Sequence, residues 1–102
     1  MNTRPRKHID AVVASVDAAR IEALTCSLVA APSVNPGGTE EEAVAVLAQA
    51  CRDAGFEVEI SEAAPGRPNL IATVNGDATG PGLMFLGHSD VVPPGPGWTG
   101  DP

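Results

Sequence analysis

A histidine and an aspartate lie two positions apart just beyond an apolar run in the sequence. Residues 83–86 read LMFL, Gly87 follows, and a single serine separates His88 from Asp90. In an extended chain, side chains two positions apart point to the same side. The imidazole and the carboxylate can then meet if the backbone bends, or they can contribute separately to a shared site. A neutral imidazole binds a metal ion through one ring nitrogen while a carboxylate accepts a hydrogen bond from the other. Taken alone, the two residues fit a loop-bracing pair equally well.

The apolar run that precedes the pair predicts a central strand of a sheet. Residues 83–86 show no polar alternation, which is typical of a strand covered on both faces. Ligands of open α/β sheets collect beyond the carboxyl ends of such strands, where His88 and Asp90 lie. The glycine-rich segment 75–82 is expected to join this strand to a preceding one at 69–74 as a hairpin. It is not a phosphate-binding loop, because it lacks a GK[ST] ending and no helix follows it.

Two helical segments are expected before the strands. An apolar stripe from Ile9 to Val16 has helical spacing, and its phase shifts near Asp17, which predicts a kink or two abutting helices. This segment ends in residues 30–38, where two prolines and two glycines stop any helix.

The second helical segment has the clearer start signal. Thr39 is followed three residues later by Glu42, a spacing that predicts a capping box. Glu40 and Glu41 add negative charge where the helix dipole is positive, and Gly55 predicts the end of the helix. Capping explains all three glutamates, so we favour it over a metal site.

The rest of the chain completes an α/β pattern. Alternating residues at 56–60 predict a strand with one apolar face, and the segment 64–68 predicts a turn before the strand at 69–74. Helices followed by strands, with a buried apolar strand at the end, indicate an α/β layered sheet that these residues do not complete.

Composition limits the partners and the location of the protein. A formal net charge of −7 argues against nucleic acid and anionic membranes as partners. Acidic residues interrupt the apolar stretch near the N-terminus, so it predicts neither a signal peptide nor a membrane span. Cys26 and Cys51 are far apart within helical segments, which indicates buried thiols in a reducing compartment. We therefore expect a cytoplasmic protein.

Three segments, in order along the chain, carry a family resemblance. They are PSVNP (32–36), GRPNLIATV (66–74) and GHSDVVPPGPGWTGDP (87–102). With them, most of residues 9–102 resembles the zinc-dependent aminoacylase, acetylornithine deacetylase and succinyl-diaminopimelate desuccinylase family of metallopeptidases. That family has a GHxDVVP strand end followed by a tryptophan and an Asp-Pro pair, a pattern far more specific than His-x-Asp.

The resemblance implies a function and a site. It implies the N-terminal part of a three-layer α/β/α catalytic domain that holds two zinc ions, with cobalt as a substitute. Such a domain hydrolyses the amide bond of N-acyl amino acids or small peptides, and the full-length enzyme can be a homodimer. By position, His88 resembles the histidine ligand of one zinc ion, and Asp90 resembles the aspartate that orients this histidine. Trp98 matches a residue at the pocket rim, where covering the strand end is an equally good role.

The sequence does not offer a complete ligand set. A catalytic zinc ion needs about three protein ligands, and the only other histidine is His8, near the N-terminus. We therefore expect residues 9–102 to be the N-terminal portion of the catalytic domain and residues 1–8 to be a flexible basic tail. The chain alone should be inactive and bind zinc weakly. Two alternatives remain open: a non-catalytic binding module, which a metal-free soluble monomer would favour, and a dimerisation module, which concentration-dependent association would favour.

Overall fold

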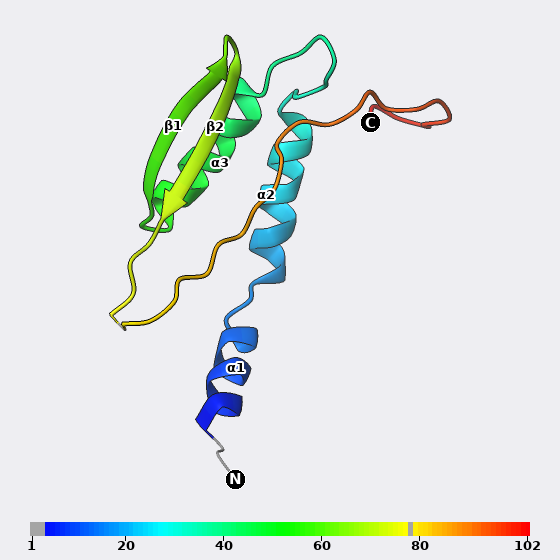
Figure 1. Cartoon of the computed structure of the whole chain (residues 1–102). Helices are drawn as coiled ribbons and strands as arrows, with labels where there is room; N and C mark the ends of the chain where they lie inside the picture. The colour runs from blue at the N-terminus through cyan, green and yellow to red at the C-terminus, as the bar shows by residue number, and fades with distance from the viewer. Residues whose placement is uncertain (1–3, 78) are drawn as a thin grey trace.

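The computed structural model of the chain describes residues 4–77 and 79–102. It contains three helices followed by two strands, as Figure 1 shows. The elements are α1 (Arg4–Ala14), α2 (Ala18–Ala30), α3 (Glu41–Asp53), β1 (Glu57–Ala64) and β2 (Arg67–Thr73). This α and β content fits part of an α/β domain.

Asp17 separates the first two helices. Its Oδ1 accepts hydrogen bonds from the backbone N–H groups of Ala19 at 3.0 Å and Arg20 at 3.2 Å. These bonds satisfy free donors at the start of α2. The phase shift near Asp17 thus marks two abutting helices, and the described residues form three helices where two helical segments were expected. The first helix also begins earlier than the apolar stripe predicts, at Arg4, because Pro5 is tolerated in a first turn.

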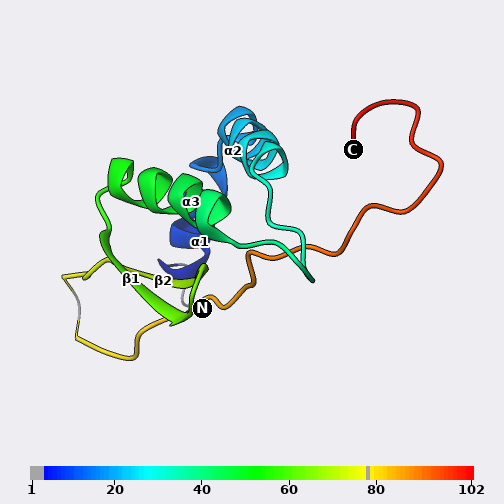
Figure 2. The same cartoon turned by 90° about the horizontal axis from the view of Figure 1, so that it is seen from above.

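The third helix and the two strands form the packed part of the molecule. Figure 2 shows α3 lying along one face of the β1–β2 hairpin, with α2 beyond it. Ala43, Val44 and Ala48 are the buried side chains of α3, with 1–3% of their surface exposed, and their spacing places them on one face. Ala31, beyond α2, is the other buried apolar residue among those described.

The two strands form an antiparallel hairpin around a short turn. Val58 pairs with Ala72 and Ile60 with Leu70, which confirms both strands and the turn between them. Gly66 in the turn has φ +73°, a left-handed conformation that favours glycine. A Cβ atom there would also lie only 2.7 Å from Cγ2 of Thr39, so the hairpin turn can approach the start of α3 only with glycine at this position.

The start of α3 differs from the predicted capping box. The residue at the N-cap is Glu40, which caps with no side-chain hydrogen bond, while the Thr39 hydroxyl donates to Oε2 of Glu41 at 3.3 Å. The reason is that Arg67 binds the Glu40 carboxylate, as described below, so the helix begins one residue later than a Thr39 cap requires. The predicted end is confirmed, because Gly55 follows the helix with φ +85° and donates from its N–H to the carbonyl of Arg52. A left-handed glycine is a common helix end.

The predicted central strand at residues 83–86 is wrong for this structure. Its four side chains are 82–91% exposed, and within residues 4–77 and 79–102 the segment pairs with no strand. The hairpin expected through residues 75–82 is therefore absent from the described chain, whose hairpin is β1–β2. A strand covered on both faces needs neighbouring strands and two covering layers. The helix that could supply one layer, α3, packs on β1–β2 instead.

The molecule is extended for its length. Its radius of gyration is 17.3 Å. A compact chain of about 100 residues has a radius of gyration of about 13 Å. Figure 1 shows the reason for the difference: α1 lies away from the packed part, and the segment after β2 is a long loop whose C-terminal end extends outward. No helix in the portion described is long and apolar enough to cross a membrane.

Because the core is small, substitution of Val44 should lower the stability of the fold. Val44→Ala should lower the free energy of unfolding by about 1.5–3 kcal/mol, because it removes two buried methyl groups and leaves a cavity. Urea denaturation followed by circular dichroism measures this change. Val12→Ala is the matched control, since Val12 on α1 is 66% exposed. This variant should stay within about 0.5 kcal/mol of wild type. Equal losses for both variants would contradict the assignment of the core to α3.

Candidate metal centre

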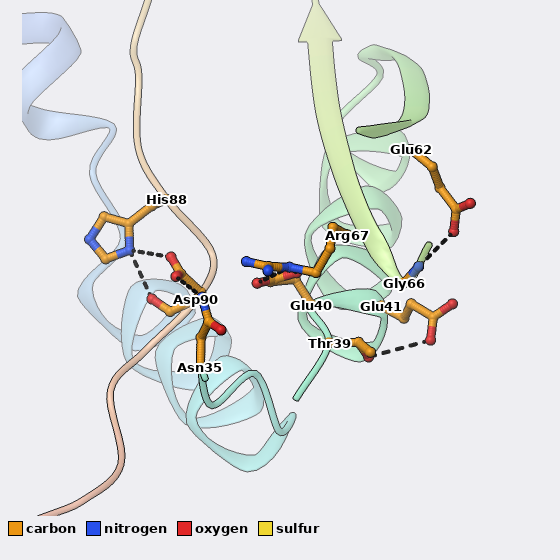
Figure 3. Close-up of polar contacts among 9 residues, drawn as sticks. All are labelled: Asn35, Thr39, Glu40, Glu41, Glu62, Gly66, Arg67, His88 and Asp90. Carbon is orange, nitrogen blue, oxygen red and sulfur yellow. Dashed lines mark hydrogen bonds and ion pairs between the residues drawn. The ribbon is translucent and has the colours of Figure 1, made fainter. Parts of the chain in front are cut away.

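His88 and Asp90 contact each other at the end of the exposed apolar segment. Nδ1 of His88 lies 2.8 Å from the backbone oxygen of Asp90 and 3.2 Å from its Oδ1 (Figure 3). Both acceptors favour a proton on Nδ1, which leaves the lone pair on Nε2 of a neutral ring. The His88 side chain is 83% exposed, so Nε2 is open to a ligand. The two predicted site residues thus meet as their spacing suggests.

The segment 32–36 holds the backbone beside this pair. Val34 and Val91 form a parallel bridge, in which Asn35 N–H donates to the carbonyl of Val91 at 2.8 Å and Val91 N–H donates to the carbonyl of Ser33 at 3.0 Å. Ser33 is buried, with 4% of its surface exposed. Two segments that carry the family resemblance, one before α3 and one after β2, are therefore joined directly by backbone hydrogen bonds.

Asn35 binds the Asp90 carboxylate from the other side. Its Nδ2 donates to Oδ2 of Asp90 at 3.2 Å, while Oδ1 faces His88. Mainly because of this hydrogen bond, and further because of the Asp90 N–H and His88, the pKa of Asp90 lies below its ordinary value of 3.8. Hydrogen bonds to the charged form of a carboxyl group act in this direction. Sequence reasoning assigned no role to Asn35, although a polar amide between Val34 and Pro36 in a mostly apolar segment is a usable signal.

The lowered pKa of Asp90 makes part of the folding stability depend on pH. A carboxyl group with a depressed folded pKa stabilises the native state above its unfolded pKa, and this contribution is lost as the pH falls through the folded value. For Asp90 the loss therefore occurs below pH 3.8. The stability difference between wild type and Asp90→Asn should shrink in acid. Because the group is partly exposed, the effect should be small and weaker at high salt. Urea midpoints measured across this range test it, and a difference independent of pH would contradict it.

An ion pair lies beside the histidine. Nε of Arg67 donates to both carboxylate oxygens of Glu40, at 2.9 and 2.6 Å. Glu40 is 5% exposed, so its charge needs this partner. The hydrogen bond and the charge of Glu40, together with the more distant charge of Asp90, raise the pKa of Arg67 above its ordinary value and keep it protonated. Sequence reasoning assigned Glu40 to helix capping and missed this pair, whose partners are 27 positions apart.

The pair and the histidine border the same open hollow. Its volume is about 390 Å³, and Figure 3 shows the Arg67 guanidinium directed toward Asp90. The residues around the hollow are Glu40, Ala63, Ala64, Arg67, Asn69, Gly87, His88, Ser89 and Asp90. Trp98 is 64% exposed and does not border this hollow, and His8 lies exposed on α1.

The residues present fit one ligand position of a metal site. His88 offers an oriented Nε2, the arrangement found where a carboxylate supports a metal-bound histidine. No group of three His, Cys, Asp or Glu residues that could hold a metal ion occurs in residues 4–77 and 79–102. A zinc site needs about three protein ligands, so further ligands would have to come from outside the described part.

Together these features define part of an α/β domain that presents a carboxylate-supported histidine at an open hollow. The sequence is 45% identical over 82 residues to the succinyl-diaminopimelate desuccinylase of Rhizorhabdus wittichii. Enzymes of the same name from Zymomonas mobilis and Xanthomonas euvesicatoria are 42% and 46% identical over 83 and 81 residues. Each match takes in 78% of this chain, and the similarity confirms the resemblance to this family that the three sequence segments predict.

The match covers most of this chain but only a small part of each relative. The aligned part is 20–21% of each of these relatives, so the chain spans about a fifth of the length of the curated relatives it matches. No family model matches the chain. No solved structure matches it either.

Proposed function

We propose that this chain is part of the catalytic domain of a zinc-dependent amide hydrolase, which removes the acyl group from an N-acyl amino acid. The observation that carries the proposal is the contact between His88 and Asp90, which leaves Nε2 of the histidine free to bind a metal ion. The similarity to succinyl-diaminopimelate desuccinylases supports this reaction class and a small acylated amino acid as substrate.

In this proposal the residues of the chain have separate tasks. His88 is the zinc ligand through Nε2, and Asp90 orients it by accepting the Nδ1 proton. A zinc ion bound to His88 and to further ligands would supply polarisation of the amide carbonyl and activation of a water molecule. The Arg67–Glu40 pair borders the same hollow as the histidine, and the Glu40 carboxylate is bound by Arg67.

The rest of the proposed active site lies outside these residues. The remaining zinc ligands, the second zinc ion and the general base belong to the rest of a three-layer catalytic domain. Residues 9–102 form a portion of that domain behind a basic segment at 1–8, whose residues 4–8 belong to α1. Cobalt is expected to substitute for zinc. A cytoplasmic location and a homodimeric full-length enzyme complete the proposal.

A segment exchange tests this function. The part of the Rhizorhabdus wittichii desuccinylase that matches this chain would be replaced by the corresponding residues of the chain, and turnover of N-succinyl-diaminopimelate measured. We expect the chimera to keep zinc-dependent hydrolysis, while the 102-residue chain alone shows none. A folded chimera without bound zinc would contradict the proposal, as would turnover that is insensitive to chelators.

A further inference from the structure

The Asp90 carboxylate is held from two sides. Oδ1 lies 3.2 Å from Nδ1 of His88, and Oδ2 accepts a hydrogen bond from Nδ2 of Asn35 at 3.2 Å. Asn35 is 55 positions away in the sequence, so the fold, and no local turn, brings its amide to this carboxylate. Figure 3 shows the three side chains in a row, with Asp90 in the middle.

The Asn35 amide is itself fixed in place. Its backbone N–H donates to Val91 and its neighbour Val34 bridges to the same residue, so the backbone of Asn35 is tied to the residue directly after Asp90. Asn35 and Asp90 are both half-buried, which limits competition from water for this bond. A donor anchored in this way can set the rotation of the carboxylate.

No other side chain takes over this task in the part of the chain that the structure describes. Arg67, the nearest cation across the hollow, directs its Nε to Glu40, and the side-chain contacts of the Asp90 carboxylate are those with Asn35 and His88. Without the Asn35 amide, the carboxylate would keep one side-chain partner, an exposed imidazole ring, beside the backbone N–H of Asp90 itself. Two partners fix the orientation of a carboxylate, whereas one leaves it free to rotate.

We propose that Asn35 is a positioning residue for His88, acting through Asp90. It holds Oδ2 so that Oδ1 faces Nδ1 of the imidazole, which favours the tautomer protonated on Nδ1 and directs the Nε2 lone pair toward the hollow. The effect on zinc affinity rests on the proposed function. The effect on the tautomer does not, because the metal-free ring has a tautomer whether or not it binds zinc. Supporting hydrogen bonds of this kind typically change metal affinity by about 10–100-fold.

The test compares the tautomer of His88 in four versions of the metal-free chimeric desuccinylase described above, in which wild type denotes the chimera without further substitution. They are wild type, Asn35→Leu, Asp90→Ala and the matched control Asn75→Leu, which makes the same substitution at an exposed position after β2. Long-range ¹H–¹⁵N NMR at about pH 8.5, roughly two units above the ordinary histidine pKa, reports which ring nitrogen carries the proton. A zinc titration followed at the ¹⁵N resonance of Nε2 then gives the affinity.

We expect the Nδ1-protonated form to predominate in wild type and in Asn75→Leu. In Asn35→Leu the other tautomer should increase in the same direction as in Asp90→Ala, with zinc affinity lowered by about tenfold or more. The shift should be incomplete, since the Asp90 carbonyl also accepts from Nδ1. Slow exchange of the Val91 amide, which bonds to Ser33, shows that the variant keeps the local fold.

Two outcomes separate the inference from the function. If Asn35→Leu keeps the wild-type tautomer while Asp90→Ala loses it, Asn35 does not position the pair and the inference is overturned. If the tautomer changes as expected but zinc binds Nε2 in none of the proteins, the inference holds and the proposed function fails. Should Asn35→Leu lose the Val91 protection, Asn35→Asp replaces it: this variant keeps the side-chain size, repels Asp90 and should give the same tautomer change.

Discussion

Replacing His88 by alanine in the chimeric desuccinylase should lower kcat/KM about a thousandfold or more. The physical reason is that the proposed zinc ligand is lost, and a bound metal ion contributes several kcal/mol to the stability of the transition state. The zinc content of the purified protein should fall in parallel, and an unchanged circular dichroism spectrum distinguishes loss of the ligand from a damaged fold. Steady-state kinetics with N-succinyl-diaminopimelate and metal analysis of the purified protein measure both quantities.

Two further variants serve as comparisons for His88→Ala. Asp90→Asn keeps the side-chain size but weakens the hydrogen bond to His88, so activity should fall by about 10–100-fold, less than for His88→Ala. His8→Ala removes the other histidine of the chain, which lies exposed on α1, and should leave activity unchanged. If His88→Ala keeps both zinc and turnover, His88 is a loop-bracing residue and not a ligand.

The exposed segment 83–86 should make the isolated chain self-associate. Its four apolar side chains are 82–91% exposed. Burying each one fully is worth about 1.5–3 kcal/mol, and the extended backbone also offers N–H and C=O groups for pairing with another chain. Combining Phe85→Lys with Leu86→Glu should therefore keep the chain monomeric at concentrations where wild type forms large, heterogeneous aggregates, as measured by size-exclusion chromatography with light scattering.

A second double variant tests whether association needs the extended backbone of residues 83–86 or only exposed apolar side chains. Val12→Lys with Val13→Glu alters two side chains that are 66% and 65% exposed, but these lie in α1. The backbone of a helix is already hydrogen-bonded, so it offers no groups for pairing. We expect this double variant to associate like wild type. If it becomes monomeric instead, α1 is the associating surface. A wild-type chain that forms one defined dimer would favour the dimerisation module over part of a catalytic domain.

Features with a local cause could be predicted from the sequence. Asp17 caps α2 through the two backbone N–H groups that follow it closely in the chain, as its residue type favours. Gly55 follows α3 with a positive φ, because the left-handed conformation is cheap for glycine. The alternation of Val58 and Ile60 likewise depends on strand geometry alone. The contact of His88 with Asp90 is also local, because the two residues are only two positions apart.

Features that depend on distant residues could not be predicted. Thr39 stands at the right spacing for a capping box. However, Arg67 of β2 binds Glu40, and this contact changes the start of the helix. The bond from Asn35 to Asp90 spans 55 positions and has no periodic signal. Residues 83–86 have the composition of a buried strand, yet composition cannot supply the neighbours that bury it.

The atom through which His88 binds zinc can be observed directly. In the chimera labelled with ¹⁵N at histidine, with His88→Ala used to assign the signals, zinc should shift the Nε2 resonance of His88 while Nδ1 stays protonated. Zinc bound at Nδ1, or a His88 ring that does not respond to zinc in a folded chimera, would contradict the account, because Asp90 would then not support a metal-bound histidine.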